Sequence, residues 1–398
     1  MSKLMTNHVF TSESVSEGHP DKVCDQISDA ILDACLAADP NSHVGCETLA
    51  ATDLVVNAGE ITCDGWNTIN PEAIAREVVK DIGYVQEDIG FSYKTFQYMN
   101  RLHGQSPDIA MGVNEGMGLF SEQGAGDQGM MFGYAADETP ELMPAPIQYS
   151  HHLLQELSRI RKEGVIPYLR PDSKSQVSVQ YENGKPSHIT AVVLSHQTED
   201  VPLERIREDL VKVAKEVLEP TGLLTDATEY YINPTGRFVV GGPHGDSGLT
   251  GRKIIVDTYG GVGCHGGGAF SGKDPTKVDR SAAYYSRYVA KNIVAAGLAA
   301  KCEIQVAYAI GVAKPMSVNV STFGTGVVSD VLLQQIVESS GLFDFRPAGI
   351  MKDLVLSKPV GWRYRDTAAY GHFGRNEPEF TWERTNKAED LKRAAGLK

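Results

Sequence analysis

The sequence predicts an α+β protein in which mixed sheets carry helices packed on one face. Strand-like and helix-like segments alternate along the whole chain instead of separating into an all-helical and an all-strand part. An Asn-Gly pair at 183–184 lies between two runs of alternating apolar residues, which is typical of an antiparallel hairpin and disfavours a doubly wound sheet. The length of 398 residues exceeds what one hydrophobic core usually supports, so two or three domains are expected.

The first third begins with the clearest helix, predicted over 20–38. Its apolar positions repeat every four residues, and its aspartates form an opposite acidic stripe: Val23, Ile27, Ile31 and Cys35 against Asp25, Asp29 and Asp33. We expect strands over 46–56 and 60–63 around a turn at 57–59, followed by a helix that Asn70 caps.

The later elements follow the same periodicities. Segment 104–123 lacks apolar periodicity, so we expect a mobile loop between domains there. The Gly-Asp-x-Gly sequence at 126–129 recurs at 245–248, which indicates an internal duplication. Further helices are expected at 149–163, 201–218, 279–298 and 330–339, and strands at 177–181, 189–194, 253–258, 302–310 and 316–323.

Composition narrows the classes of function. The 41% hydrophobic and 22% charged residues are typical of a soluble globular protein. The net charge of −14 argues against binding to nucleic acid or to anionic membranes. No signal peptide or membrane-spanning run is visible, and the six cysteines lack CxxC spacing. We therefore expect a cytoplasmic protein with reduced thiols.

Segment 241–280 reverses the acidic character of the chain. Between Arg237 and Arg280 there are six Lys or Arg residues against four Asp or Glu residues, set among glycine-rich turns. Glycines allow a backbone to approach a ligand closely, and clustered cations attract anions. The segment therefore indicates a site for a polyanionic small molecule, such as the phosphate chain of a nucleotide.

The glycine-rich part of this segment, 267–273, satisfies the G-x-x-x-x-G-K pattern of a phosphate-binding P-loop. However, Asp274 stands where that motif needs Ser or Thr for magnesium, and the loop is far from the strand expected at 253–258. A different loop that also wraps phosphates is the favoured interpretation, and a glycine-rich surface turn is the alternative.

Other candidate residues have structural explanations as well. His19 and Asp21 stand at a helix start, where they could bind phosphate and magnesium or merely cap the helix. Residues 172–174 are expected in a turn, either at a ligand or in a solvated loop. Asp246 fits an Asx-turn, and Asp279 fits the N-cap of the helix that follows.

Taken together, four segments resemble the signatures of the S-adenosylmethionine synthetase (methionine adenosyltransferase) family. They are Gly-His-Pro-Asp-Lys at 18–22, Gly-Asp-Gln-Gly at 126–129, Gly-Asp-Ser-Gly at 245–248 and the glycine-rich run at 265–274. The likeness extends from about Phe10 to Lys398.

The resemblance implies an enzyme that joins ATP and L-methionine. The methionine sulfur would attack C5′ of the ribose, and the triphosphate would leave and then be hydrolysed to pyrophosphate and phosphate. A thioether has no proton to remove, so catalysis must come from alignment and from charge stabilisation of the leaving group. This explains a site that is rich in cations and lacks a Ser-His-Asp arrangement.

The resemblance also implies roles for single residues. The phosphate chain would contact His19, Lys174, Arg252, Lys253 and Lys273. The rest of the ATP site would comprise Asp172, Ser173, Arg237, Phe238, Asp246 and Ala269. Methionine would bind to Glu60, Gln105, Asp246 and Lys277. Two Mg²⁺ ions per site would use Asp21 and Asp279, and K⁺ would use Glu47.

The family fold has three similar α+β domains related by a pseudo-threefold axis, expected here at 5–106, 122–241 and 242–385. Its members form homodimers or dimers of dimers with the active site at the dimer interface. Glu60 and Gln105 would then come from the neighbouring subunit.

Two other functions share the phosphate-binding features. An ATP-dependent phosphotransferase or ligase acting on a small acid would break a phosphate–phosphate bond first. A nucleotide-sensing subunit would bind ATP without turnover, although it would not need both magnesium carboxylates.

Overall fold

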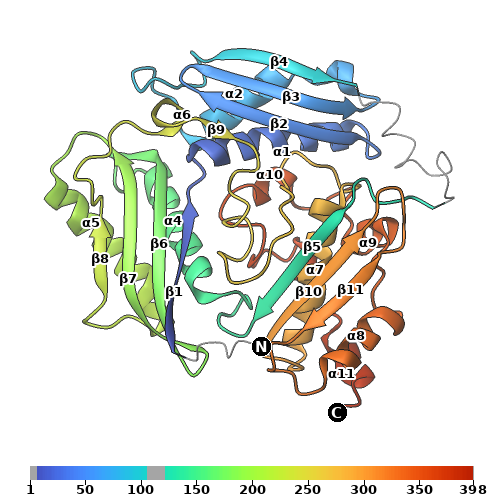
Figure 1. Cartoon of the computed structure of the whole chain (residues 1–398). Helices are drawn as coiled ribbons and strands as arrows, with labels where there is room; N and C mark the ends of the chain where they lie inside the picture. The colour runs from blue at the N-terminus through green and yellow to red at the C-terminus, as the bar shows by residue number, and fades with distance from the viewer. Residues whose placement is uncertain (1–6, 105–121, 398) are drawn as a thin grey trace.

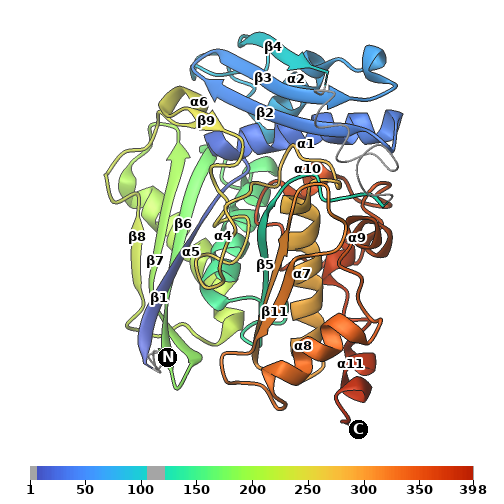
Figure 2. The ribbon, with the colours of Figure 1, turned by 45° about the vertical axis from the view of Figure 1, so that its right-hand side comes forward.

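The computed structural model describes residues 7–104 and 122–397 and places three β-sheets around a shared centre (Figure 1). One long helix packs against each sheet on the side that faces this centre: α1 (Pro20–Ala38), α4 (Ala145–Lys162) and α7 (Val278–Ala295). A view turned by 45° shows α4 beside β1 and β6, and α7 beside β5 (Figure 2). The predicted α+β class with three similar domains is confirmed.

Two of the sheets have four strands and one has three in the described residues. The first is ordered β4 (Gln97–His103), β3 (Leu54–Thr62), β2 (His43–Ala51) and β9 (Gly248–Leu249). The second is ordered β1 (His8–Val15), β6 (Leu169–Glu182), β7 (Lys185–Thr198) and β8 (Glu229–Ile232). The third is ordered β11 (Ser317–Ser321), β10 (Lys301–Tyr308) and β5 (Gly129–Ala136).

The remaining helices are shorter than α1, α4 and α7. They are α2 (Pro71–Ile82), α5 (Leu203–Leu218), α6 (Gly242–Gly245), α8 (Asp330–Ser339), α9 (Pro347–Leu354), α10 (Tyr364–Thr367) and α11 (Ala388–Ala394). Single 3₁₀ turns occur at Trp66–Thr68, Glu219–Thr221 and Thr381–Glu383.

The three thirds of the chain exchange strands in a cycle. β1 of the first third pairs antiparallel with β6 of the second, β5 of the second pairs with β10 of the third, and β9 of the third pairs with β2 of the first. No sheet is therefore built from one contiguous third of the sequence. The contiguous domain boundaries at 5–106, 122–241 and 242–385 stay a prediction.

The helix α1 has the predicted bounds, and both of its faces are buried. The apolar stripe packs in the core, where Val23, Ile27 and Ile31 have no exposed surface. The acidic stripe faces loops of the last third: Asp25 accepts a hydrogen bond from the Gly251 amide at 2.9 Å. Asp29 accepts from the Gly272 amide at 2.8 Å. Asp33 accepts from the amides of Tyr364 and Arg365 at 2.7 and 2.9 Å. Helix α1 thus positions the loops that carry the candidate cations.

Several local predictions are confirmed and some are wrong. Asn70 caps α2, and the hairpin between β6 and β7 turns at Asn183 and Gly184, both with positive φ. The predicted turn at 57–59 is wrong, because these residues lie inside β3 and the turn is at 52–53. The strand predicted at 253–258 is also wrong, since that segment forms consecutive turns.

The other predicted helices and strands occur with shifted ends, except α8, whose bounds are as predicted. Asp172–Lys174 lie in β6 instead of a turn, because this segment pairs with β7. Asp279 lies in the first turn of α7, while Lys277 is the N-cap. Most of the predicted loop at 104–123 lies outside the described residues.

Candidate active site

The first group of candidate residues surrounds the N-terminus of α1. His19 is the N-cap, and its Nδ1 accepts a hydrogen bond from the Asp21 amide at 3.2 Å. Asp21 Oδ2 lies 2.5 Å from Lys253 Nζ, and Asp21 Oδ1 accepts from the Leu249 amide at 2.9 Å. Arg252 Nε lies 3.9 Å from Asp21 Oδ1. Helix capping and an acid–base cluster therefore coexist at the same residues.

Burial and neighbouring charge set the protonation of this group. Burial, reinforced by the charge of Lys253, lowers the pKa of His19 to about 3, so the ring is neutral near pH 7. Its Nδ1 is an acceptor, which makes Nε2 the N–H donor. Burial opposes the ionisation of Asp21, but the bonds from Lys253 and Leu249 outweigh it and lower the pKa.

The start of β6 adds Asp172, Ser173 and Lys174. Asp172 Oδ2 accepts a hydrogen bond from the Gly242 amide at 2.9 Å, whereas Asp172 Oδ1 is buried and has no hydrogen-bond partner. Burial raises the pKa of Asp172 to about 6. The Ser173 amide donates to Ser16 Oγ at 2.9 Å, which ties β6 to the segment before His19, and Lys174 is exposed. A buried acceptor without a donor fits a ligand that brings hydroxyl or amino groups.

The second group lies around the glycine-rich loop and the start of α7. Lys273 Nζ is 2.6 Å from Asp279 Oδ2, and Lys277 Nζ is 2.5 Å from Asp274 Oδ2. A cavity of about 370 Å³ opens beside these pairs. Its walls include the predicted residues Glu47, Glu60, Ala269, Lys273, Lys277 and Asp279.

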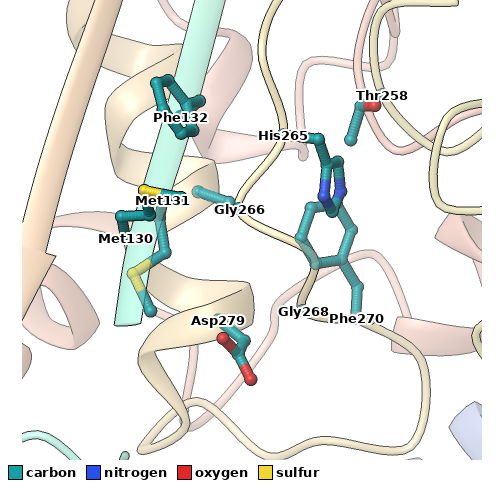
Figure 3. A pocket seen from close by; sticks show the side chains of 10 residues that line it. Met130, Met131, Phe132, Thr258, His265, Gly266, Gly268, Phe270 and Asp279 are labelled. Atoms are coloured by element: carbon teal, nitrogen blue, oxygen red, sulfur yellow. The ribbon is translucent and has the colours of Figure 1, made fainter. Parts of the chain in front are cut away.

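A smaller hollow shares Asp279 with this cavity (Figure 3). Met130 and Met131 of β5 line one side of it, and His265 and Phe270 of the glycine-rich loop line the other. The loop therefore lies between the strand that the second third donates and the first turn of α7.

The glycines of this loop mainly allow contact within the chain. A Cβ on Gly266 would lie 1.7 Å from the Met130 carbonyl oxygen, and a Cβ on Gly272 would lie 1.9 Å from that of Cys46. Gly267 differs, because its φ is +96° and the space around it is open. Close packing on β5 and β2 thus explains two glycines, and only Gly267 faces room for a ligand.

The candidate residues therefore separate into two groups within one chain. In the described residues, no hydrogen bond or ion pair joins the His19–Asp21 group to the Lys273–Asp279 group. The loops nevertheless meet, because a Cβ on Gly251 would lie 2.6 Å from Ala269 Cβ.

Some predicted residues take little part in either group. Arg237 pairs with Asp200 at 3.2 Å on the surface. Asp246 is exposed, yet its charge contributes to the raised pKa of Asp172. Phe238 is half-buried, and its carbonyl accepts from the Thr198 amide at 2.9 Å. Gln105 lies outside the described residues.

Comparisons with known proteins identify the family. Three family models, for the N-terminal, central and C-terminal domains of S-adenosylmethionine synthetase, match residues 7–107, 122–238 and 240–384. The chain belongs to the S-adenosylmethionine synthetase family.

The similarity also covers whole relatives. The S-adenosylmethionine synthase of Treponema denticola is 60% identical over 390 residues, which are 97% of this chain and 98% of that protein. The S-adenosylmethionine synthase of Desulforudis audaxviator is 57% identical over 400 residues, covering 98% of this chain and 99% of that protein.

One residue of the cavity wall, Asp127, is not among the predicted site residues. Asp127 is exposed and lines the same cavity as Lys277 and Glu60. The sequence contains a signal for Asp127, because the Gly-Asp-x-Gly pattern at 126–129 recurs at 245–248. Asp246 of the second copy is a predicted site residue, and Asp127 is the equivalent position of the first copy.

The surroundings of Asp21 and Asp279 indicate what kind of metal ion these two predicted ligands could bind. Across residues 7–104 and 122–397, no group of three or more His, Cys, Asp or Glu side chains is placed to hold a metal ion. Asp21 and Asp279 are instead single carboxylates, each beside a lysine. Mg²⁺ usually takes one or two protein carboxylates together with phosphates and waters, so these residues fit an ion that arrives with a polyphosphate.

Proposed function

We infer that this chain synthesises S-adenosyl-L-methionine from ATP and L-methionine, releasing triphosphate that is then hydrolysed to pyrophosphate and phosphate. Family membership across all three domains is the observation that carries this conclusion. Lys273 on the cavity wall and Lys253 and Arg252 near His19 are cations that can offset the negative charge of a triphosphate leaving group.

The chemistry needs alignment more than proton transfer. The methionine thioether is already a nucleophile, and the carbon–oxygen bond at C5′ breaks as the sulfur enters from the opposite side. The negative charge that develops on the triphosphate is met by Lys253, Arg252 and Lys273, and by the Nε2–H of neutral His19. Lys253 and Lys273 are held beside Asp21 and Asp279 before substrate arrives, whereas Arg252 is 55% exposed and lies farther from Asp21.

The nucleotide half of the proposed site uses the start of β6. The unpartnered Asp172 Oδ1 accepts from the nucleoside, and exposed Lys174 reaches the phosphates. Ser173, Arg237, Phe238, Asp246 and Ala269 complete this half. In this proposal Arg237 leaves Asp200, an exposed pair that costs little to break.

Glu60 and Lys277 of the proposed methionine half lie in the larger cavity. Lys277 meets the carboxylate of the amino acid, while Glu60, Asp246 and Gln105 meet its ammonium and polar groups. Glu60 and Lys277 both line this cavity, which supports the assignment.

Cations complete the proposed site. Asp21 and Asp279 would each hold one Mg²⁺ with the phosphates, and Glu47, on the cavity wall, would hold K⁺. Bound Mg²⁺ supplies charge neutralisation to the leaving phosphates.

We also propose a homodimer, or a dimer of dimers, with the active site at the subunit interface. The separation of the site residues into two groups supports it, because a second copy can bring the Glu60 side of one chain to the Asp172 side of another. The outer face of the first sheet exposes Leu49, Met99 and Leu249, which supports this face as the contact.

A cytoplasmic location without nucleic-acid or membrane partners completes the proposal. All six cysteines are free, which fits a reducing compartment. Within the described part of the chain, none of the helices has both the length and the apolar character needed to cross a membrane.

One assay tests the activity. The protein is incubated with ATP, Mg²⁺, K⁺ and methionine, and the products are analysed by mass spectrometry. We expect an adenosylated sulfonium together with pyrophosphate and phosphate. ADP or AMP without sulfonium would instead indicate the phosphotransferase or ligase, and ATP binding without turnover would indicate a sensing subunit.

A further inference from the structure

The buried phenol of Tyr84 lies where the three thirds of the chain meet beside the nucleotide half of the site. Tyr84 follows α2 in the first third and has no exposed surface. Its ring packs edge-to-face against Phe91, with ring centroids 5.4 Å apart, and this contact restricts the orientation of the side chain.

The first contact of this phenol concerns the segment that leads into His19. The Tyr84 hydroxyl donates to the Gly18 carbonyl oxygen at 2.5 Å. Gly18 is pressed against the second third, because a Cβ there would lie 2.3 Å from the Pro171 carbonyl oxygen. Since Gly18 directly precedes the N-cap His19, this bond fixes the peptide from which the imidazole projects.

The second contact concerns the loop that holds Asp172. Gly242 belongs to the last third and has φ of +62°, and a Cβ there would lie 2.3 Å from the Tyr84 hydroxyl oxygen. The Gly242 amide is the donor to Asp172 Oδ2 at 2.9 Å. The phenol therefore sets the distance between the Gly18 carbonyl and the backbone that orients Asp172.

We propose that Tyr84 is a positioning residue that sets His19 and Asp172 in register for the nucleotide. This inference rests on the proposed function. The hydroxyl touches neither reacting atom, and it acts through Gly18 on one side and Gly242 on the other. Burial keeps the pKa of Tyr84 well above its ordinary value, so the phenol stays protonated and remains a hydrogen-bond donor at neutral pH.

The test compares two buried tyrosines that make the same kind of bond. Tyr84→Phe removes the hydroxyl and keeps the ring. Tyr308→Phe is the matched control, because the Tyr308 hydroxyl also donates to a backbone carbonyl, that of Phe345, at 2.5 Å, and its residue is 4% exposed. Steady-state kinetics with ATP and with methionine, and thermal unfolding, are measured for both.

We expect Tyr84→Phe to lower kcat/KM for ATP by roughly 10- to 100-fold, the scale of a small misplacement of a binding group. The KM for methionine should change by less than about twofold, because Glu60 and Lys277 of the methionine half line the larger cavity. Tyr308→Phe should lower the unfolding temperature by a similar amount and leave kcat/KM for ATP within about twofold. Equal kinetic losses in the two variants, or a loss spread over both substrates, would overturn the proposal.

A second variant disturbs the same contact from the other side. Gly242→Ala places a methyl group against the Tyr84 hydroxyl, and its control is Gly222→Ala, where φ is +68° and no atom lies within 4 Å of the new Cβ. Both variants carry the same backbone strain, but only Gly242→Ala should reduce kcat/KM for ATP. Identical behaviour of the two would refute the role.

A double-mutant cycle separates positioning from general destabilisation. Because Tyr84 acts in part through His19, the variant His19→Ala with Tyr84→Phe should lose less activity than the product of the single losses. Independent losses would contradict this coupling. Binding of ATP alone, measured by calorimetry for wild type and Tyr84→Phe, keeps the inference testable even if the wild-type protein forms no sulfonium. A weaker affinity in the variant is expected, and an unchanged affinity would count against it.

Discussion

Asp21 and Asp29 lie eight residues apart on α1, and they have similar partners that differ in their exposure to solvent. Each accepts a backbone amide, from Leu249 at 2.9 Å and from Gly272 at 2.8 Å. Each also faces a cation, Lys253 at 2.5 Å and Arg280 at 2.6 Å. The Arg280 side chain is 1% exposed, however, whereas those of Lys253 and Arg252 are 18% and 55% exposed.

This difference separates a scaffold pair from a site pair. Both oxygens of Asp29 are saturated, because Arg280 donates to each of them and Gly272 adds a third bond. Lys253 and Arg252, which face Asp21, keep access to solvent and can reach a phosphate, while Asp21 itself is only 3% exposed and keeps the Leu249 amide as a hydrogen-bond partner. A buried ion pair does not readily give up one partner to a ligand, because the other charge would then remain unpaired in a region of low dielectric constant.

The largest expected effect lies at the scaffold pair. Arg280→Met leaves Asp29 buried without its cation, so the free energy of unfolding should fall by about 3–5 kcal/mol, measured by urea denaturation. Arg363→Met is the control, since that arginine is 62% exposed in its pair with Asp366. It should cost less than about 1 kcal/mol. Equal losses would erase the distinction between the two kinds of pair.

Asp172 sharpens the comparison, because it is as buried as a scaffold carboxylate but has one unpartnered oxygen. Its pKa is raised from 3.8 to about 6, so the unfolded chain ionises first as the pH increases. The stability associated with the protonated form is therefore complete below pH 3.8 and is lost as the pH rises through about 6.

Asp172→Asn does not titrate, so its stability relative to wild type should increase across this window by up to about 3 kcal/mol. Urea unfolding of both proteins at several pH values measures the difference. A difference that stayed constant, or that changed with the opposite sign, would show that Asp172 is not held in this environment.

The next effect concerns a site pair. Lys273→Met removes a half-exposed cation that faces the cavity, and kcat should fall roughly 100-fold or more, equivalent to about 2.7 kcal/mol. The free energy of unfolding should change by less than about 1 kcal/mol, because the pair with Asp279 is accessible to water. Lys80→Met, in an exposed pair on α2, serves as the control and should retain full turnover. Near-normal turnover of Lys273→Met would remove this lysine from the site.

The smallest effect compares two members of the α1 stripe directly. Asp21→Asn keeps an oxygen for the Leu249 amide but loses the charge, so about tenfold more Mg²⁺ should be needed for half-maximal activity. The Asp33 carboxylate accepts hydrogen bonds from the Tyr364 and Arg365 amides. Asp33→Asn should therefore leave the Mg²⁺ midpoint unchanged and lower the free energy of unfolding instead. An unchanged midpoint for Asp21→Asn would move the magnesium ligand elsewhere.

Local sequence accounted for much of the secondary structure. Helices α1 and α8, the Asn70 cap and the Asn183–Gly184 turn follow from periodicity and turn chemistry, which depend on neighbouring residues only. The strand predicted at 253–258 failed because its apolar run is held in turns by distant groups: Gly251 bonds to Asp25, and Lys22 bonds to Asp257 at 2.5 Å. Periodicity contains no information about such partners.

The candidate site divides in the same way. The resemblance assigns His19, Lys253, Lys273 and Asp279 to phosphate or metal binding, and these roles stay predictions. The unpartnered oxygen of Asp172 and the phenol of Tyr84 between Gly18 and Gly242 gave no sequence signal, because each depends on residues from different thirds of the chain.

The amino-acid sequence alone determined which residue types stand at each turn, cap and helix face, since those choices depend on φ, side-chain volume and charge within a few residues. Only the tertiary structure decided which of the equally spaced aspartates of α1 became scaffold and which faces exposed cations. The physical reason is that solvent access, and with it the strength of an ion pair, depends on the strands and loops that distant parts of the chain bring to that helix.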